Sequence, residues 1–232
     1  VAALQGTLSL LHEQQGRAIE DLQHLTSLAA QYPLTLWRVG VAARHATSGQ
    51  TEEARTEFES LAANDFSDVP RDLMWIHSMS RLSDLAVRFG DAQRAAILYG
   101  LLLPYREHCI VTGGISIIRG TVSHWLGALA TILSRYDEAE RHFEHSLEMT
   151  TRMRARIWVA HTQHDYAQML GARAGPGDRE KATALAAQAL ATARAVGMKP
   201  LEAHVRQLQA AAGFVETERV DPAPEARPTS GA

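Results

Sequence analysis

Apolar residues recur at intervals of three and four along most of the chain, which is the spacing of one face of an α-helix. One such stripe contains Leu82, Leu85, Ala86 and Phe89. The segments between the prolines are rich in Ala, Leu, Arg and Glu, which are good helix formers. The pattern predicts an all-α protein of about eleven helices, near residues 2–14, 17–31, 34–47, 51–64, 70–89, 91–103, 114–133, 137–150, 154–172, 178–197 and 199–212.

One stretch reads differently. Residues 110–118 (IVTGGISII) have the local signature of a two-stranded hairpin around a Gly pair. We predict a helix over 114–133 instead, because a helix that reaches Leu133 in phase needs about fifteen residues, a usual length. Gly113 and Gly114 then form the loop before it. Pro70 and Pro200 fit the first turns of the helices at 70–89 and 199–212.

The helical pattern ends at Gly213. Residues 216–232 contain three prolines, mixed charge and few apolar side chains. Such a segment buries too little apolar surface to offset the entropy lost on ordering. We therefore predict one helical domain over 1–213 and a disordered tail over 214–232.

Composition excludes several classes of function. The net charge is −3 and no basic block is present, which argues against direct nucleic-acid binding. No apolar run is long enough for a membrane span, and no signal-peptide pattern is visible, so we expect no membrane contact and a cytoplasmic location. The single cysteine, Cys109, excludes a disulfide framework and a multi-cysteine zinc site. The chain begins at Val1 within an amphipathic pattern, as a piece of a longer protein would.

Four segments repeat one spacing. Four alanines mark the repeat at intervals of 41, 44 and 43 residues: Ala54, Ala95, Ala139 and Ala182. Each alanine follows a turn residue by five positions, and further core positions lie four and seven residues after it. A second small residue precedes each alanine by twelve positions, or by fifteen in the last unit. A small residue on each of two antiparallel helices allows their axes to cross closely. These second residues are Ala42, Ser83, Gly127 and Ala167.

The spacing of Leu126-Gly127, Ala139, Phe143 and Ser146 resembles that of tetratricopeptide repeats, although the units exceed the standard 34 residues. Three segments also resemble the C-terminal repeat region of large actinobacterial signalling proteins. In those proteins similar repeats follow a signal-transduction ATPase module, and some members carry a class III nucleotide cyclase domain or a helix-turn-helix for transcription regulation. The segments are 101–105 (LLLPY), 136–144 (YDEAERHFE) and 189–194 (ALATAR).

This resemblance implies a tetratricopeptide-like α-solenoid of antiparallel helix pairs with a concave face. It implies a non-catalytic module, and the chain contains no Gly-Lys pair from which a P-loop could be built. We expect the partner to be a protein or peptide segment, or another domain of the parent chain; the oligomeric state stays open. The concave face is predicted to present His77, Ser80, Asp84, Arg88, His124, Thr131, His161, His164 and Gln168.

Other interpretations remain beside this one. A groove with a deep apolar pocket would favour a repeat domain that senses a small molecule and controls a cyclase or a transcription regulator. His161 and His164 share a helical face and would suit zinc with a third ligand, but none has a convincing position, so we predict no metal and no cofactor. Nothing in the sequence places a base beside Cys109. The four tryptophans fit packing between helix pairs better than an aromatic cage.

Overall fold

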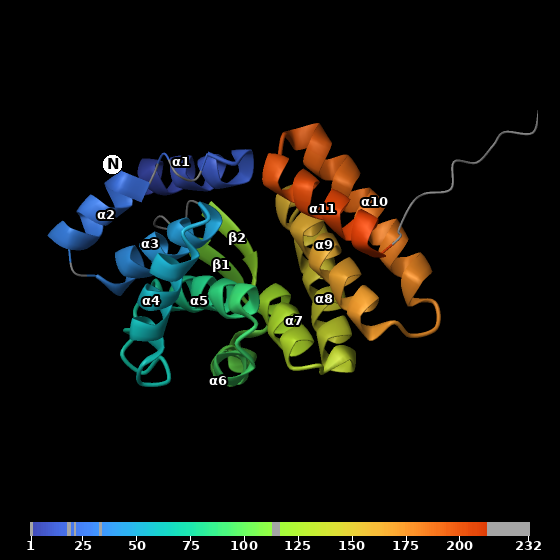
Figure 1. Ribbon diagram of the computed structural model, residues 1–232, viewed down its shortest axis with the longest axis horizontal. Helices are drawn as coiled ribbons and strands as arrows, with labels where there is room; N and C mark the ends of the chain where they lie inside the picture. The colour runs from blue at the N-terminus through green and yellow to red at the C-terminus, as the bar shows by residue number, and fades with distance from the viewer. Residues whose placement is uncertain (1, 18–19, 21, 33, 113–116, 213–232) are drawn as a thin grey trace, which may run out of the picture.

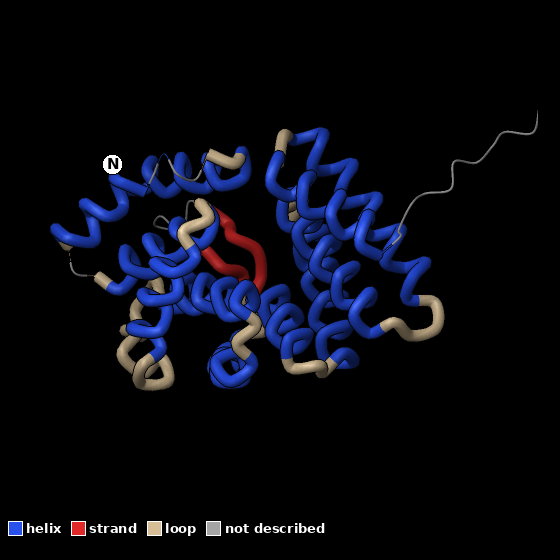
Figure 2. Tube along the Cα trace, viewed as in Figure 1, coloured by secondary structure: helices blue, strands red, loops and turns tan. Residues whose placement is uncertain are grey.

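The computed structural model describes residues 2–17, 20, 22–32, 34–112 and 117–212, and the predicted tail at 214–232 lies outside these ranges. Within them the chain is mostly helical, as predicted (Figures 1 and 2). A 3-10 turn, η2 (Leu103–Tyr105), precedes the strands β1 (Cys109–Thr112) and β2 (Ile117–Thr121). The eleven helices of the described residues are α1 (Ala2–Gln15), α2 (Leu22–Gln31), α3 (Thr35–Thr47), α4 (Thr51–Ala62), α5 (Trp75–Phe89), α6 (Ala92–Leu102), α7 (Val122–Ile132), α8 (Tyr136–Arg152), α9 (Arg156–Arg173), α10 (Asp178–Val196) and α11 (Lys199–Ala212).

The helices are arranged as pairs around an inner row. Helices α3, α5, α7, α9 and α11 contact one another in that order, and α4, α6, α8 and α10 each pack against the preceding inner helix. The chain forms an arch in Figure 1, and α1 lies across its open side with its end beside α11. None of the described helices combines the length and the apolar character needed to cross a membrane.

Small residues occupy the crossings of the four pairs. The eight residues that the repeat spacing singled out are all buried, and Ala54, Ala95, Ala139 and Ala182 are fully inaccessible to solvent. At the α7–α8 crossing, a Cβ atom added to Gly127 would lie 2.8 Å from the Phe143 ring. The helices of this pair therefore approach as closely as a glycine allows.

This contact reverses the usual effect of replacing a helical glycine. Gly127→Ala should lower the free energy of unfolding by about 1–3 kcal/mol, because the added methyl group overpacks the crossing. Gly40→Ala in α3, where nothing lies within 4 Å of the added Cβ, should raise it by about 0.5–1 kcal/mol through helix propensity alone. Urea denaturation of both variants measures the difference, and a gain in stability for both would show that the crossing is looser than described.

The helix predicted over 114–133 is wrong in its first half. Residues 109–112 and 117–121 pair as an antiparallel hairpin, and α7 begins only at Val122. The β-branched residues on both sides favour the extended backbone, and the Thr121 side chain caps α7 by accepting a hydrogen bond from the His124 amide at 3.2 Å. Gly113 and Gly114 lie outside the described residues. The hairpin, red in Figure 2, lies near the middle of the molecule.

Helix α5 also begins later than predicted, at Trp75 rather than Pro70. Residues 63–74 form turns and bends, and Asp65 and Phe66, with positive φ angles of 52° and 62°, interrupt the helical backbone after α4. Asp72 accepts a hydrogen bond from the Met74 amide at 2.8 Å, which satisfies a donor in the turn that leads into α5. Pro200 does lie in the first turn of α11.

Candidate functional site: a polar cavity inside the arch

A cavity of about 840 Å³ lies inside the arch. Its lining comes from α1, α3, α5, α7, α9 and α11, with Phe143 of α8 at one side. The inner helices of the pairs therefore present their free faces to one space. Seven of the nine residues predicted for the concave face line it: Asp84, Arg88, His124, Thr131, His161, His164 and Gln168.

The other two predicted residues, His77 and Ser80, do not belong to the lining of this cavity. Ser80 is 2% exposed, and its hydroxyl donates a hydrogen bond to the His77 carbonyl at 2.7 Å. The Nδ1 atom of His77 is buried without a hydrogen-bond partner. Helix α5 contacts strand β1, so the unpredicted hairpin adds cover to a helix that the repeat pattern left open.

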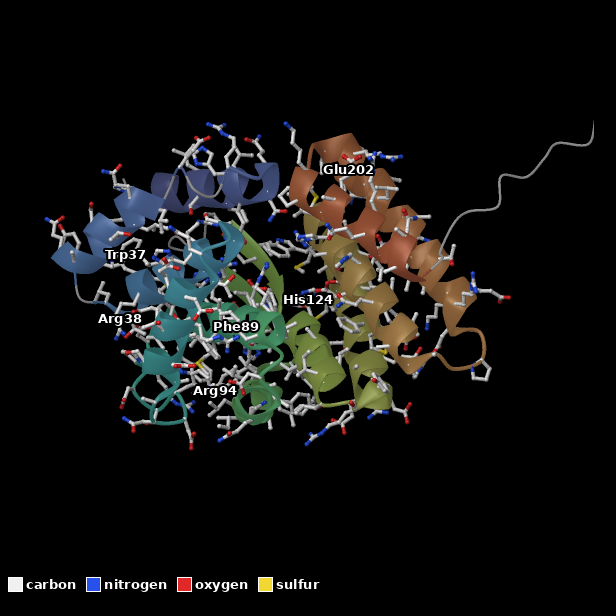
Figure 3. The ribbon with its side chains drawn as sticks, viewed as in Figure 1. Trp37, Arg38, Phe89, Arg94, His124 and Glu202 are labelled. Atoms are coloured by element: carbon white, nitrogen blue, oxygen red, sulfur yellow. The ribbon has the colours of Figure 1, made fainter. Side chains whose placement is uncertain are left out.

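An aspartate between two histidines forms the polar centre of the cavity. Asp165 of α9 lies 3.2 Å from Nε2 of His124 and 2.7 Å from Nδ1 of His164. His124 projects from α7 at the middle of the molecule (Figure 3), and its Nδ1 lies 3.1 Å from the Thr162 hydroxyl. Its ring also stands edge-on to Trp125 at 4.8 Å. The His124 ring is therefore fixed by contacts on two sides.

The cavity shifts the charge states of its groups. Burial alone would raise the pKa of Asp165, but hydrogen bonds from His124 and His164 outweigh it, and the pKa lies well below the usual range. Burial lowers the pKa of His161 to about 4. Near neutral pH the site therefore holds an ionised Asp165 beside a neutral His161, whose Nε2 lies 2.8 Å from Oε1 of Gln14.

Groups that a ligand can reach lie on three helices, α5, α7 and α9. Arg88 pairs with Asp84 one turn earlier on α5, at 2.8 Å, and its side chain is 39% exposed. Gln168 of α9 is exposed, and Thr131 of α7 is half-buried. Together they offer hydrogen-bond donors and acceptors of the kind that an extended polypeptide needs for its own N–H and C=O groups.

Sequence reasoning missed part of the lining. Glu13 and Gln14 come from the end of α1, Arg81 from α5 and His204 from α11. The repeat spacing assigned the inner face only within each helix pair, so it gave no reason for α1 to fold back over the open side. The centroid of the His204 ring lies 6.2 Å from that of His164. The two residues are far apart in the sequence, so local spacing could not predict this contact.

Two side chains that carry nucleophilic atoms, Ser123 and Cys109, lie outside the cavity lining. The Ser123 hydroxyl lies 3.3 Å from Nδ1 of His142, but Ser123 is fully buried and does not line the cavity. Burial raises the pKa of Cys109, whose sulfur lies 3.3 Å from that of Met153. Among the residues that the structure describes, no three His, Cys, Asp or Glu side chains are placed to hold a metal ion.

Comparisons with known proteins leave the function open. No protein-family model and no curated protein match the chain. Among solved structures it is similar to BtubC (BKLC) from P. vanneervenii, with 18% sequence identity over 96% of this chain and 97% of that chain, and a TM-score of 0.46. A likeness of this size carries no argument about activity or partner.

Proposed function

We propose that the chain is a non-catalytic interaction module, a tetratricopeptide-like stack of antiparallel helix pairs whose cavity binds a polar segment of a protein partner. The observation that carries the proposal is the convergence of seven predicted concave-face residues on one space of about 840 Å³. Repeat proteins use such concave surfaces to hold extended ligands. The reachable groups Arg88 and Gln168 supply directional contacts, while Trp125 and Phe143 supply apolar wall.

A peptide selection tests the proposal. Peptides selected on the protein from a random display library should be rich in polar and acidic residues. Arg88→Ala should lower the affinity for these peptides about tenfold, which corresponds to about 1.4 kcal/mol of binding free energy. Arg94→Ala is the matched control. Arg94 also forms an ion pair with an aspartate three residues before it, Asp91, and the Arg94 side chain is 32% exposed, similar to that of Arg88. Arg94 lies on α6, away from His124 (Figure 3).

Two results would contradict the proposed binding site. If no peptide is enriched, or if Arg88→Ala and Arg94→Ala weaken the selected peptides equally, the cavity is not the binding site. Circular dichroism of both variants confirms that each retains its helices, so that loss of binding is not loss of the fold.

One observation favours a second function, the binding of a small molecule. Helices α1 and α11 close over the cavity, which brings Gln14, Pro200 and Leu201 into its lining, and its volume falls in the range of about 300–1,000 Å³ that is usual for ligand pockets. Native mass spectrometry distinguishes the two functions. A single bound mass that disappears in Trp125→Ala would support the small molecule, whereas a bare protein that binds the selected peptides supports the first function.

We propose further that this module is the regulatory arm of an ATPase-linked signalling protein. The resemblance of the segments at 101–105, 136–144 and 189–194 to such proteins supports this role. Small rotations between stacked helix pairs would relay the binding of a partner to the other domains. The coding sequence upstream of Val1 provides the test, since a P-loop motif there supports the role and an unrelated domain contradicts it.

A further inference from the structure

Helix α1 is attached to the arch by polar contacts. None of its described side chains belongs to the apolar core or packs against it, and Leu8 and Leu11 are 37% and 48% exposed. The guanidinium of Arg44 instead donates hydrogen bonds to the Ser9 carbonyl at 3.0 Å and to its hydroxyl at 2.7 Å. The part of this helix whose side chains are described, residues 8–15, is therefore held by ionic and hydrogen-bond contacts rather than by burial in the apolar core.

The strongest of these contacts is made by Glu13. One carboxylate oxygen accepts a hydrogen bond from Arg81 at 2.9 Å, and the other accepts one from Arg119 at 2.8 Å and lies 3.3 Å from Arg44. The three arginines come from α5, β2 and α3, and each side chain is at most 8% exposed. Three separate elements of the arch therefore converge on one carboxylate.

This arrangement has the chemistry of a carboxylate receptor. A guanidinium presents paired donors in a fork that matches a carboxylate, and each of these three is held away from water. Buried cations repel one another unless an anion lies between them. Burial and the charges of Arg81 and Arg44 act to lower the pKa of Arg119, and Glu13 opposes them. The cluster therefore requires an anion, and Glu13 reaches it from a helix outside the core.

We propose that Arg44, Arg81 and Arg119 form a carboxylate-binding site, and that Glu13 is its internal ligand, which an acidic peptide segment displaces together with α1. This deepens the proposed function and rests on it in one respect, that the natural ligand is a peptide segment in the cavity. Arg81 lines both the cluster and the cavity, so a segment seated beside Arg88 extends naturally into the arginine site. Undocking α1 also removes Gln14 from His161 and opens one wall.

The wild-type protein provides the first test, by amide hydrogen exchange. A saturating concentration of an oligoglutamate peptide should increase exchange in α1 while that in α10 stays unchanged, because the peptide carboxylates replace Glu13 in the arginine cluster and α1 then undocks. An α1 that keeps its protection while the peptide is bound overturns the proposal. This measurement needs no variant, so it holds even where a substitution in the cluster impairs folding.

The second test measures binding of a fluorescent oligoglutamate peptide at low salt. Glu13→Gln should bind it about tenfold more tightly than wild type, because a competing internal ligand lowers apparent affinity by the fraction of molecules that it occupies. Glu20→Gln is the control, since it removes the same charge from an exposed pair with Arg17. In the double variant Glu13→Gln/Arg119→Gln, the affinity for oligoglutamate should return to the wild-type level.

Each outcome decides between the two proposals. Equal binding by Glu13→Gln and Glu20→Gln, or tight binding that survives Arg119→Gln, overturns the carboxylate site. If oligoglutamate behaves as expected but the selected peptides ignore Arg88→Ala, the arginine site stands and the proposed function fails. If the selected peptides require Arg88 but bind wild type and Glu13→Gln equally, the proposed function stands and the internal ligand is refuted.

Discussion

Replacing Phe143 by alanine should lower the free energy of unfolding by about 3–5 kcal/mol, the usual cost of emptying a fully buried aromatic site. The ring is inaccessible to solvent, stacks on Tyr166 with centroids 5.5 Å apart, and fills the gap over Gly127 between α7 and α8. For a chain of this length the midpoint of thermal unfolding should fall by about 10 °C. Calorimetry together with urea denaturation measures both quantities.

Leu73→Ala serves as the comparison for this variant. Leu73 is 79% exposed, so its truncation should change stability by no more than about 0.5 kcal/mol. A loss below about 1 kcal/mol for Phe143→Ala would mean that the α7–α8 crossing is not the tightly packed contact described above.

The protein should also lose stability in mild acid. Burial lowers the pKa of both His142 and His161 to about 4. The unfolded chain takes up these protons near pH 6.5, whereas the folded chain resists until about pH 4, so stability falls as the pH drops through this window. We expect a loss of about 1–3 kcal/mol from His161 and less from His142, which solvent screens more strongly.

Urea denaturation at several pH values between about 7 and 4 checks this expectation. His161→Asn should show a shallower decline than wild type, since it lacks one of the titrating groups. The lowered pKa values of Glu13 and Asp165 act only below the ordinary carboxyl range, so they steepen the decline below about pH 4. A stability that is flat from pH 7 to pH 4 would contradict the assignment of neutral buried histidines.

The helix pairs were predictable because the need for small residues where two helices cross leaves a regular spacing in the sequence. A small residue on one helix must face a small residue on its partner, and this spacing is visible at Ala42 and Ala54 without any structure. The hairpin was missed for the opposite reason. Its two halves gain stability only from pairing with each other and from cover by α5, and a phase argument along one helix cannot detect pairing.

The residues of the site fall into the same two groups, those that local spacing predicts and those that depend on long-range contacts. Asp84, Arg88 and Gln168 follow from counting positions along the first helix of each pair, because that helix is anchored by its own partner. Glu13 and Arg119 could not be found by counting. They depend on α1 folding back over the arch and on the hairpin, and these long-range placements leave no periodic signal in the sequence.

The most direct test of the account locates the bound peptide. A photo-crosslinking amino acid is placed at Gln168, an exposed position in the cavity lining, and in a second protein at Gln93, an exposed position on α6 outside it. Irradiation with the selected peptide should give a covalent adduct at position 168, suppressed by excess unlabelled peptide, and none at position 93. Adducts at position 93, or at both positions equally, would contradict the claim that the cavity inside the arch is where this protein holds its partner.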